Sequence, residues 1–392
     1  MKQPKIRFNG FTGEWEEKNI SSVANLKAGK SIDTSQEISF PSNGYYPCFG
    51  GNGLRGYVRD YTHDGIYNII GRQGALCGNV KLVSGKFHAT EHAVVVSPIT
   101  PLDPYFLYNL LTKANINQYA TGVAQPGISV QNVNKSLFLV LPDFSEQQIV
   151  GMYFKNLDSL IQSTEKKIDS LKQVKAASLQ SMFPQEGETT PRVRFKGFEG
   201  EWENIKFAAF AEINRGLTYT PNNIAEKGVR VLRSSNIDED VFIISSEDVF
   251  VTPNCINIHY AKEGDILITA ANGSPRLVGK HAIIKNTASI PVVAGGFMYL
   301  VTSQESGFLN ASMSSSWYWR FLKIGVAGGN GSIGNLNRND LEEMVFPIPS
   351  LKEERDMIAS YFTALDSQIS LHSQRLEKLK QIKSACLDNM FV

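Results

Sequence analysis

The 392-residue sequence lacks the features that mark several classes of protein. No stretch approaches the roughly 20 apolar residues that a membrane span needs. The charged N-terminal segment also lacks the apolar run of a secretory signal. These absences favour a cytoplasmic protein that makes no membrane contact. Hydrophobic residues make up 42% and charged residues 20% of the chain, a composition that suits two or more ordinary soluble domains.

Cysteine is scarce, and an excess of charge of one sign is missing. The four cysteines stand singly and never at the CxxC spacing of zinc sites: Cys48, Cys77, Cys255 and Cys386. We expect them to be small hydrophobic side chains in a reducing compartment. The formal net charge is +1. A domain that binds nucleic acid is often strongly basic, so any contact with DNA has to be local.

Catalytic motifs are missing or incomplete. Residues 88–92 read HATEH, the H-x-x-E-H pattern of a metalloprotease subclass. That chemistry needs a helix, whereas the motif runs directly into AVVVSP, a β-type segment. Gly29-Lys30-Ser31 resembles the end of a phosphate-binding loop, but Ala24 stands where its first glycine belongs. No methyl-transfer signature, G-x-G-x-x-G loop or G-x-S-x-G elbow occurs. We expect a non-catalytic chain without a metal or cofactor of its own.

What the sequence does contain is an internal duplication. PKIRFNGFTGEWE at 4–16 returns as PRVRFKGFEGEWE at 191–203, with nine of thirteen positions identical. A second pair of similar segments ends in MF, at Phe183 and at Phe391. The order is therefore module, helix, module, helix.

Both closing segments are predicted to be long amphipathic helices. Each begins with a proline, a small polar cap candidate and early acids. Each then carries a stripe of residues that step alternately by four and three, as in a coiled-coil seam. The first stripe consists of Leu157, Ile161, Thr164, Ile168, Leu171, Lys175, Ser178 and Met182. The second consists of Leu365, Ile369, His372, Leu376, Leu379, Lys383, Cys386 and Met390. A helix of this length is a rod of roughly 55 Å.

The simplest partner for each stripe is the other stripe, in an antiparallel pair. The alternative is that each helix packs only on its own module. The polar segment PQEGETTP at 184–191 marks the boundary between the halves. We expect globular domains over 1–144 and 191–350, helices over 145–183 and 351–392, and a linker over 184–190.

The module interiors are rich in short β-type runs broken by glycine, with one helical stretch each, at 104–119 and 306–322. The segment 66–80 aligns loosely with 265–281 and superposes Gly74 on Gly273. The segment 125–134 corresponds to 329–340. The expected class is α+β, with two α/β modules, two long antiparallel coiled-coil helices and a pseudo-two-fold internal repeat.

Polar and basic side chains gather in the glycine-rich loops. Arg and Lys suit the guanine edge, Asn and Gln suit adenine, and Ser and Lys reach phosphates. The candidates in the first module are Asn52, Arg55, Arg59, Arg72 and Gln73. Those in the second are Arg233, Ser234, Ser235, Asn236, Asn272, Ser274, Arg276 and Lys280. For each of them the alternative is a solvated loop position.

Taken together, these features resemble the specificity subunit of a type I restriction–modification enzyme over essentially the whole chain. The WE openings at 15–16 and 202–203, the helix openings LPDFSEQQ and IPSLKEER and the MF endings carry the resemblance. So do GRQGALCGNV at 71–80 and GDILITAANGS at 264–274, which resemble core motifs of target-recognition domains. The first module departs from this pattern, because its DGIYNIIGRQG lacks the GDIL wording.

The resemblance implies two target-recognition domains that each read one half of a split, asymmetric site in double-stranded DNA. It implies helices whose length determines the spacer between the halves. It also implies partners: two modification (methyltransferase) subunits and two restriction (motor-nuclease) subunits, to which S-adenosylmethionine, ATP and Mg²⁺ belong. Two other functions are weighed against this one, a coiled-coil scaffold that binds only protein and a zinc hydrolase that uses 88–92.

Overall fold

A computed structural model describes residues 3–74, 76–122, 126–287, 290–326 and 334–392. The chain forms two compact units. Unit 1 comprises Met1–Glu165 and Arg375–Val392, and unit 2 comprises Lys166–Gln374. The long helices α3 (Phe144–Ser181) and α8 (Lys352–Met390) begin within a residue of their expected starts, and each contributes to both units.

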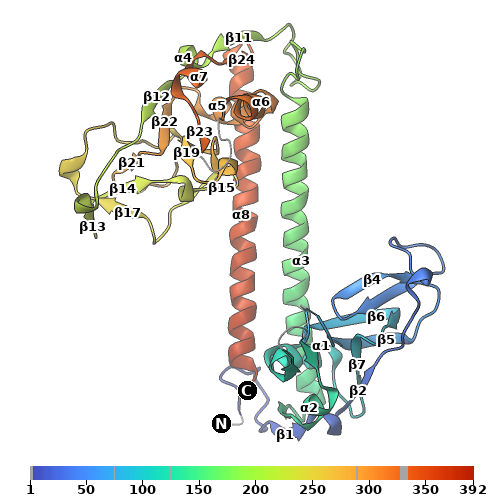
Figure 1. The fold of residues 1–392 in the computed structure, drawn as a ribbon. Helices are drawn as coiled ribbons and strands as arrows, with labels where there is room; N and C mark the ends of the chain where they lie inside the picture. Colours follow the sequence, from blue (N-terminus) through green and yellow to red (C-terminus); the bar gives the residue numbers. More distant parts are fainter. Residues whose placement is uncertain (1–2, 75, 123–125, 288–289, 327–333) are drawn as a thin grey trace. The chain divides into compact units, whose positions relative to one another are not determined.

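Unit 1 is built on one six-stranded sheet (Figure 1). Its strand order is β2 (Ala24–Ala28), β7 (Ala93–Pro98), β5 (His63–Gly71), β6 (Val80–Ala89), β3 (Tyr46–Gly50) and β4 (Gly53–Val58). The valine run of β7 is buried in the sheet, as β-branched side chains favour. Helices α1 (Pro104–Lys113) and α2 (Val130–Lys135) complete the unit with two short antiparallel pairs. These are β1 (Glu16–Asn19) with β10 (Leu137–Val140), and β8 (Ala120–Thr121) with β9 (Gly127–Ile128).

Unit 2 has two four-stranded sheets in place of the single six-stranded sheet of unit 1. One has the order β12 (Glu212–Arg215), β22 (Met298–Thr302), β18 (Ile266–Thr269) and β20 (His281–Ile283). The other has the order β13 (Ile224–Ala225), β17 (Val249–Val251), β14 (Val229–Leu232) and β21 (Val292–Ala294). In unit 1, β6 pairs with both β5 and β3 and so joins them in one sheet. In unit 2 these two pairings are made by separate strands, because β20 pairs with β18 and β21 pairs with β14.

Short pairs and helices complete unit 2. The pairs are β11 (Glu203–Lys206) with β24 (Val345–Ile348), β15 (Ile237–Asp238) with β16 (Val241–Phe242), and β19 (Ala271–Asn272) with β23 (Gly334–Asn335). The helices are α4 (Phe207–Phe210), α5 (Ser306–Met313), α6 (Ser316–Gly325) and α7 (Arg338–Glu343). The single helical stretch expected at 306–322 is thus two helices, separated by a turn at 314–315.

Within each unit the long helices run antiparallel, which confirms the expected direction of pairing. In unit 1, Lys383 lies 2.6 Å from Asp158, and Lys380 lies 2.8 Å from Glu165. In unit 2, Lys175 lies 2.8 Å from Asp366. The helices also pack on the globular parts, since Phe154 and Phe362 belong to the cores of units 1 and 2. All sixteen positions of the two stripes are buried or half-buried.

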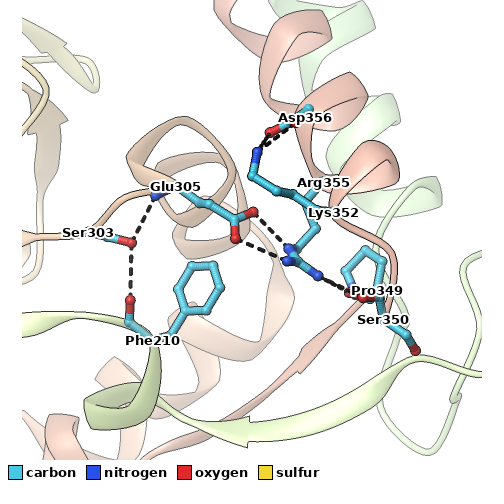
Figure 2. A network of polar contacts seen from close by, with 8 residues as sticks. All are labelled: Phe210, Ser303, Glu305, Pro349, Ser350, Lys352, Arg355 and Asp356. Atoms are coloured by element: carbon cyan, nitrogen blue, oxygen red, sulfur yellow. Dashed lines mark hydrogen bonds and ion pairs between the residues drawn. The ribbon is translucent and has the colours of Figure 1, made fainter.

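The polar and charged residues at the start of each long helix hold its first turn. The Asp143 carboxylate accepts hydrogen bonds from the backbone N–H groups of Ser145 and Glu146 and so caps α3. Hydrogen bonds from Ser145, the largest of them from its hydroxyl, lower the pKa of Asp143. In α8 the first turn is anchored differently. Arg355 donates to the carbonyls of Pro349 and Ser350 and pairs with Glu305 at 2.7 Å (Figure 2).

Four aromatic side chains meet in each unit where a long helix ends. In unit 1 Phe391 packs on Trp15, Phe106 and Phe154, with ring centroids 5.4–5.7 Å apart. In unit 2 the corresponding members are Phe183, Trp202, Phe308 and Phe362, and Phe183 lies 5.8–6.2 Å from the other three. Each cluster therefore joins the WE opening of one repeat to the MF ending of the other, which explains why both motifs recur.

Gly151, the one glycine inside α3, is required by close packing against α1. A Cβ there would lie 2.9 Å from the backbone nitrogen of Phe106 and closer still to Asp103, which caps α1. Helix propensity alone favours alanine by about 1 kcal/mol, but overpacking costs about 1–3 kcal/mol. We expect Gly151→Ala to destabilise unit 1 by up to about 2 kcal/mol in denaturant unfolding, the overpacking cost less the gain in helix propensity.

The control for this prediction is Ser170→Ala at an exposed position of the same helix, where the change should stay within about 0.5 kcal/mol. A Gly151→Ala protein more stable than the wild type would show that the approach of α1 is not tight.

Candidate nucleic-acid interface

In unit 1 a hollow of about 400 Å³ lies where the turn after β3 meets the end of β5. We call it hollow 1; its lining consists of Gly51, Asn52, Arg55, Gln73, Gly74 and His92. Three of the five residues predicted from the sequence are therefore brought together, from segments about twenty residues apart. The Arg55 guanidinium lies 2.5 Å from the Glu37 carboxylate, which holds it in place beside the hollow.

The other two predicted residues of unit 1 lie outside hollow 1. Arg59 donates to the Tyr45 hydroxyl at 3.0 Å, with its guanidinium over the same ring. Arg72 is half-buried, and its Nη1 donates to the Glu91 carbonyl at 3.4 Å. Arg59 is exposed and stays available to phosphates, whereas Arg72 is turned toward the protein.

Unit 2 has a larger hollow, of about 670 Å³, formed by the segments that follow β12 and β14, by β19 and by the turn before β22; more of its lining side chains are apolar. We call it hollow 2. Its lining includes Arg233, Ser234 and Asn272 from the prediction, together with Tyr219, Ile224 and Phe297. The Asn272 amide donates to the Ser234 hydroxyl at 3.0 Å, which joins the β14 and β19 segments across the hollow.

Asn236 is a correction to the prediction. It is fully buried, its side-chain oxygen accepts from Arg233 N at 2.8 Å, and its amide donates to Ile243 O and to the Asp248 carboxylate. Asn236 thus holds its turn together and cannot reach a ligand, because a short polar side chain in a turn often bonds the local backbone instead. The remaining candidates, Ser235, Ser274, Arg276 and Lys280, are not in the lining of hollow 2; Ser235 and Arg276 lie in short 3-10 helices.

The residues of the H-x-x-E-H motif do not adopt the helix that metalloprotease chemistry needs. His88 is the last but one residue of strand β6, and its Nε2 lies 3.0 Å from the Lys30 carbonyl, while Glu91 and His92 lie in the following turn. Among the described residues, no three or more His, Cys, Asp or Glu side chains are grouped as metal ligands would be. The hydrolase hypothesis therefore has no structural support.

The two hollows occupy the same place in one backbone framework. Backbone hydrogen bonds of unit 1 recur in unit 2 at corresponding points of the strands. In unit 1 they run from Gly29 to Ala93, Thr90 to Phe49, Arg72 to His92, Gly78 to Gly71 and Ile128 to Arg72. In unit 2 they run from Gly216 to Met298, Gly295 to Leu232, Ala270 to Phe297, Gly279 to Thr269 and Leu336 to Ala270. The duplication therefore continues through module interiors whose sequences have diverged.

These bonds identify which residues correspond in the two hollows. The pairs are Gly51 with Ser234, Asn52 with Ser235, Gln73 with Ala271, Gly74 with Asn272, and His92 with Phe297. The alignment of Gly74 on Gly273 is thus wrong by one position, because the loop that follows has three more residues in unit 2. The correspondence of Ile128 with Leu336 agrees with the expected alignment of 125–134 on 329–340, parts of which lie outside the described residues.

Sequence reasoning missed the residue that differs most between the hollows. In the sequence His92 stands out only as part of the HATEH motif at 88–92, and Phe297 does not stand out as a candidate. The available signal was the Gly295-Gly296 pair before Phe297, since two glycines ahead of an aromatic residue indicate a close backbone approach.

The chain thus repeats one backbone framework, with a hollow of different lining in each unit and two long helices that contribute to both units. No helix in the described ranges is both long and apolar enough to cross a bilayer. Residues 12–173 and 199–381 both match the type I restriction modification DNA specificity domain family. The chain belongs to this family and is a specificity subunit, the non-catalytic component of a type I restriction–modification system.

Three relatives illustrate the similarity. The EcoprrI specificity subunit of Escherichia coli is 42% identical over 151 residues, which are 38% of this chain and 37% of that protein. A putative specificity subunit of Haemophilus influenzae, S.HindORF215P, is 23% identical over 370 residues, 89% of this chain and 87% of the relative. The crystal structure of the S subunit from M. genitalium covers 100% of this chain and 99% of its own, with 16% identity and a TM-score of 0.76. This last likeness is one of fold.

Proposed function

We propose that the two units read the two halves of a bipartite, asymmetric site in double-stranded DNA and that the chain brings methyltransferase and restriction subunits to that site. The observation that carries the proposal is the pair of hollows in one framework. Hollow 1 is lined mainly by polar side chains, and hollow 2 mainly by apolar ones. Two readers of unlike sequences need the same scaffold with different contact chemistry.

The partners supply what the chain does not. We infer that S-adenosylmethionine, ATP and Mg²⁺ bind to the modification and restriction subunits, and that the assembly acts on DNA in the cytoplasm. The buried arginine–glutamate pairs at the helix openings and the aromatic clusters recur in both units, so two copies of one modification subunit would meet the same underlying frame. This repetition supports a stoichiometry of two.

The test of DNA reading uses the chain assembled with its modification subunits. We expect binding that weakens with salt, because phosphate contacts release counterions, and that prefers duplexes selected from a random pool. Gln73→Ala should relax the preference in one half-site only, by about 5- to 150-fold at one base pair, since a bidentate contact is worth about 1–3 kcal/mol. Arg59→Ala, exposed and outside hollow 1, is the matched control and should weaken binding without changing preference.

An assembly that binds random and selected duplexes equally would leave the protein-binding scaffold as the remaining function. A Gln73→Ala variant that changed both half-sites would show that the two units do not read independently.

The long helices lead to a second prediction, about the spacer. We propose that their length determines the distance between the half-sites. Deleting 163–169 together with 371–377 removes one heptad at repeat-equivalent places of α3 and α8 and preserves the phase of both stripes. Each helix shortens by about 10 Å, which corresponds to about three base pairs of DNA. We expect a shorter spacer between unchanged half-sites when methylated sites are mapped.

The control deletes four residues from each helix and so breaks the phase of the stripes, which should abolish binding rather than shift the spacer. Unchanged spacing in the seven-residue variant, or new half-sites, would exclude a role of the helices in setting the distance.

A further inference from the structure

Phe297 is an exposed aromatic ring on a firmly held backbone. Its side chain is 68% exposed, whereas its carbonyl accepts hydrogen bonds from Ala270 N at 2.8 Å and from Ala271 N at 3.1 Å. The two preceding residues lie tight against neighbouring backbone: a Cβ on Gly295 would be 3.0 Å from Leu232 O, and one on Gly296 would be 3.1 Å from Leu217 O. The turn therefore presents an exposed ring on a constrained backbone, at the rim of hollow 2.

The lining of hollow 2 suits a flat, partly apolar ligand with polar edges. Tyr219, Pro221 and Ile224 supply apolar surface. Arg233 is the one charged residue in the described lining, and no carboxylate accompanies it. The Ser234 hydroxyl accepts from Asn272, which leaves its own proton free to donate to a ligand edge. A volume of about 670 Å³ is in the range of pockets that hold small organic groups.

Hollow 1 shows that this chemistry is not imposed by the framework. At the position of Phe297 it has His92, which lies 3.2 Å from the Glu91 carboxylate. Its lining offers Asn52, Gln73 and Arg55, side chains that read base edges by hydrogen bonds without disturbing the stack. The corresponding position of the two hollows therefore holds an exposed apolar ring in unit 2 and a polar side chain in unit 1.

We propose that Phe297 inserts as a wedge into the half-site bound by unit 2 and stacks on a base, and that hollow 2 receives the base it displaces. Apolar side chains that enter a base step unstack it, and aromatic rings bind the exposed face of any base. In hollow 2 the displaced base meets Tyr219 with its ring and Ser234 with its polar edge. The inference rests on the proposed DNA reading.

The test places 2-aminopurine at each position of the unit 2 half-site in turn, in duplexes bound by the assembly of the chain with its modification subunits. This base analogue fluoresces when it leaves the stack. We expect one position to brighten with the wild type and to stay dark with Phe297→Ala, which should also bind about tenfold or more weakly. Phe297→Trp, which keeps an aromatic face, should preserve both the signal and the affinity.

His92→Ala is the matched control, because it changes the corresponding position in unit 1 and should leave the unit 2 signal intact. A base extruded by the methyltransferase instead would remain bright with Phe297→Ala, and that result would overturn the proposal. So would specific binding by the wild type with no bright position that depends on Phe297. If the wild type showed no sequence preference at all, the proposed function would fail, and the wedge with it.

Discussion

Phe391→Ala is expected to lower the free energy of unfolding of unit 1 by about 3–5 kcal/mol, the usual cost of removing a buried phenylalanine ring. The side chain is 3% exposed and lies within 5.7 Å, between ring centroids, of Trp15, Phe106 and Phe154. Its removal would leave a cavity between Trp15, which directly precedes β1, helix α1 and the two long helices. Since stability can differ between the two units, hydrogen exchange resolved along the chain is the appropriate measurement.

The internal repeat supplies the controls. Phe183→Ala should produce the same loss of protection in unit 2, because Phe183 packs on Trp202, Phe308 and Phe362. Removal of Val392 alone, a residue that is 38% exposed, should change little. Equal loss of protection in both units after Phe391→Ala would mean that the clusters do not stabilise the units separately.

Arg194→Ala is expected to destabilise unit 2 by about 3–5 kcal/mol, because it leaves a buried carboxylate without its partner. The Glu354 side chain is 1% exposed and accepts from Arg194 Nε at 2.7 Å and Nη2 at 2.8 Å, and Arg194 Nη1 donates to Gly200 O at 2.6 Å. The hydrogen bond that Arg194 donates to Glu354 raises the pKa of Arg194, so the guanidinium stays charged.

Two variants separate the loss of the pair from the loss of any arginine. Arg192→Ala breaks the exposed pair with Glu188, whose side chains are 60% and 33% exposed, and should cost less than about 1 kcal/mol. The double variant Arg194→Met with Glu354→Leu replaces both charges by apolar groups and should recover most of the stability. If the double variant were as unstable as Arg194→Ala, packing rather than the unpaired charge would explain the effect.

The same pair exists in unit 1, between Arg7 and Glu146 at 2.7 Å, with the glutamate side chain 2% exposed. Both pairs join the first residues of a repeat to the first turn of the long helix that follows its module. The arginines stand in the segments 4–16 and 191–203, whose similarity first showed the duplication. The pairs explain why an arginine stands at the same place in both segments, since a buried carboxylate requires a charged partner in each copy.

Much of this architecture was predictable from the sequence because it depends on local patterns. The four-and-three spacing of the stripes predicts helices, and Asp143 predicts where α3 begins. Of the candidates from the glycine-rich loops, Asn52 and Gln73 lie together in hollow 1, and Arg233 and Asn272 lie together in hollow 2. Their contact with DNA stays a prediction. Asn236 was misjudged because the sequence does not show which way a polar side chain turns.

The correspondence between the two hollows could not be predicted, because it depends on pairing between distant strands. Gly74 and Asn272 occupy corresponding positions in the two units. Only the register of the strands shows this, through backbone hydrogen bonds between segments far apart in the sequence. The same register places His92 and Phe297 at one position although their neighbours in the sequence differ. The sequence by itself thus determined the repeat, the helices and their caps, since these follow from spacing along the chain. The tertiary structure alone decided which residues share a hollow and which helix end completes each aromatic cluster, because those contacts join segments that are far apart in sequence.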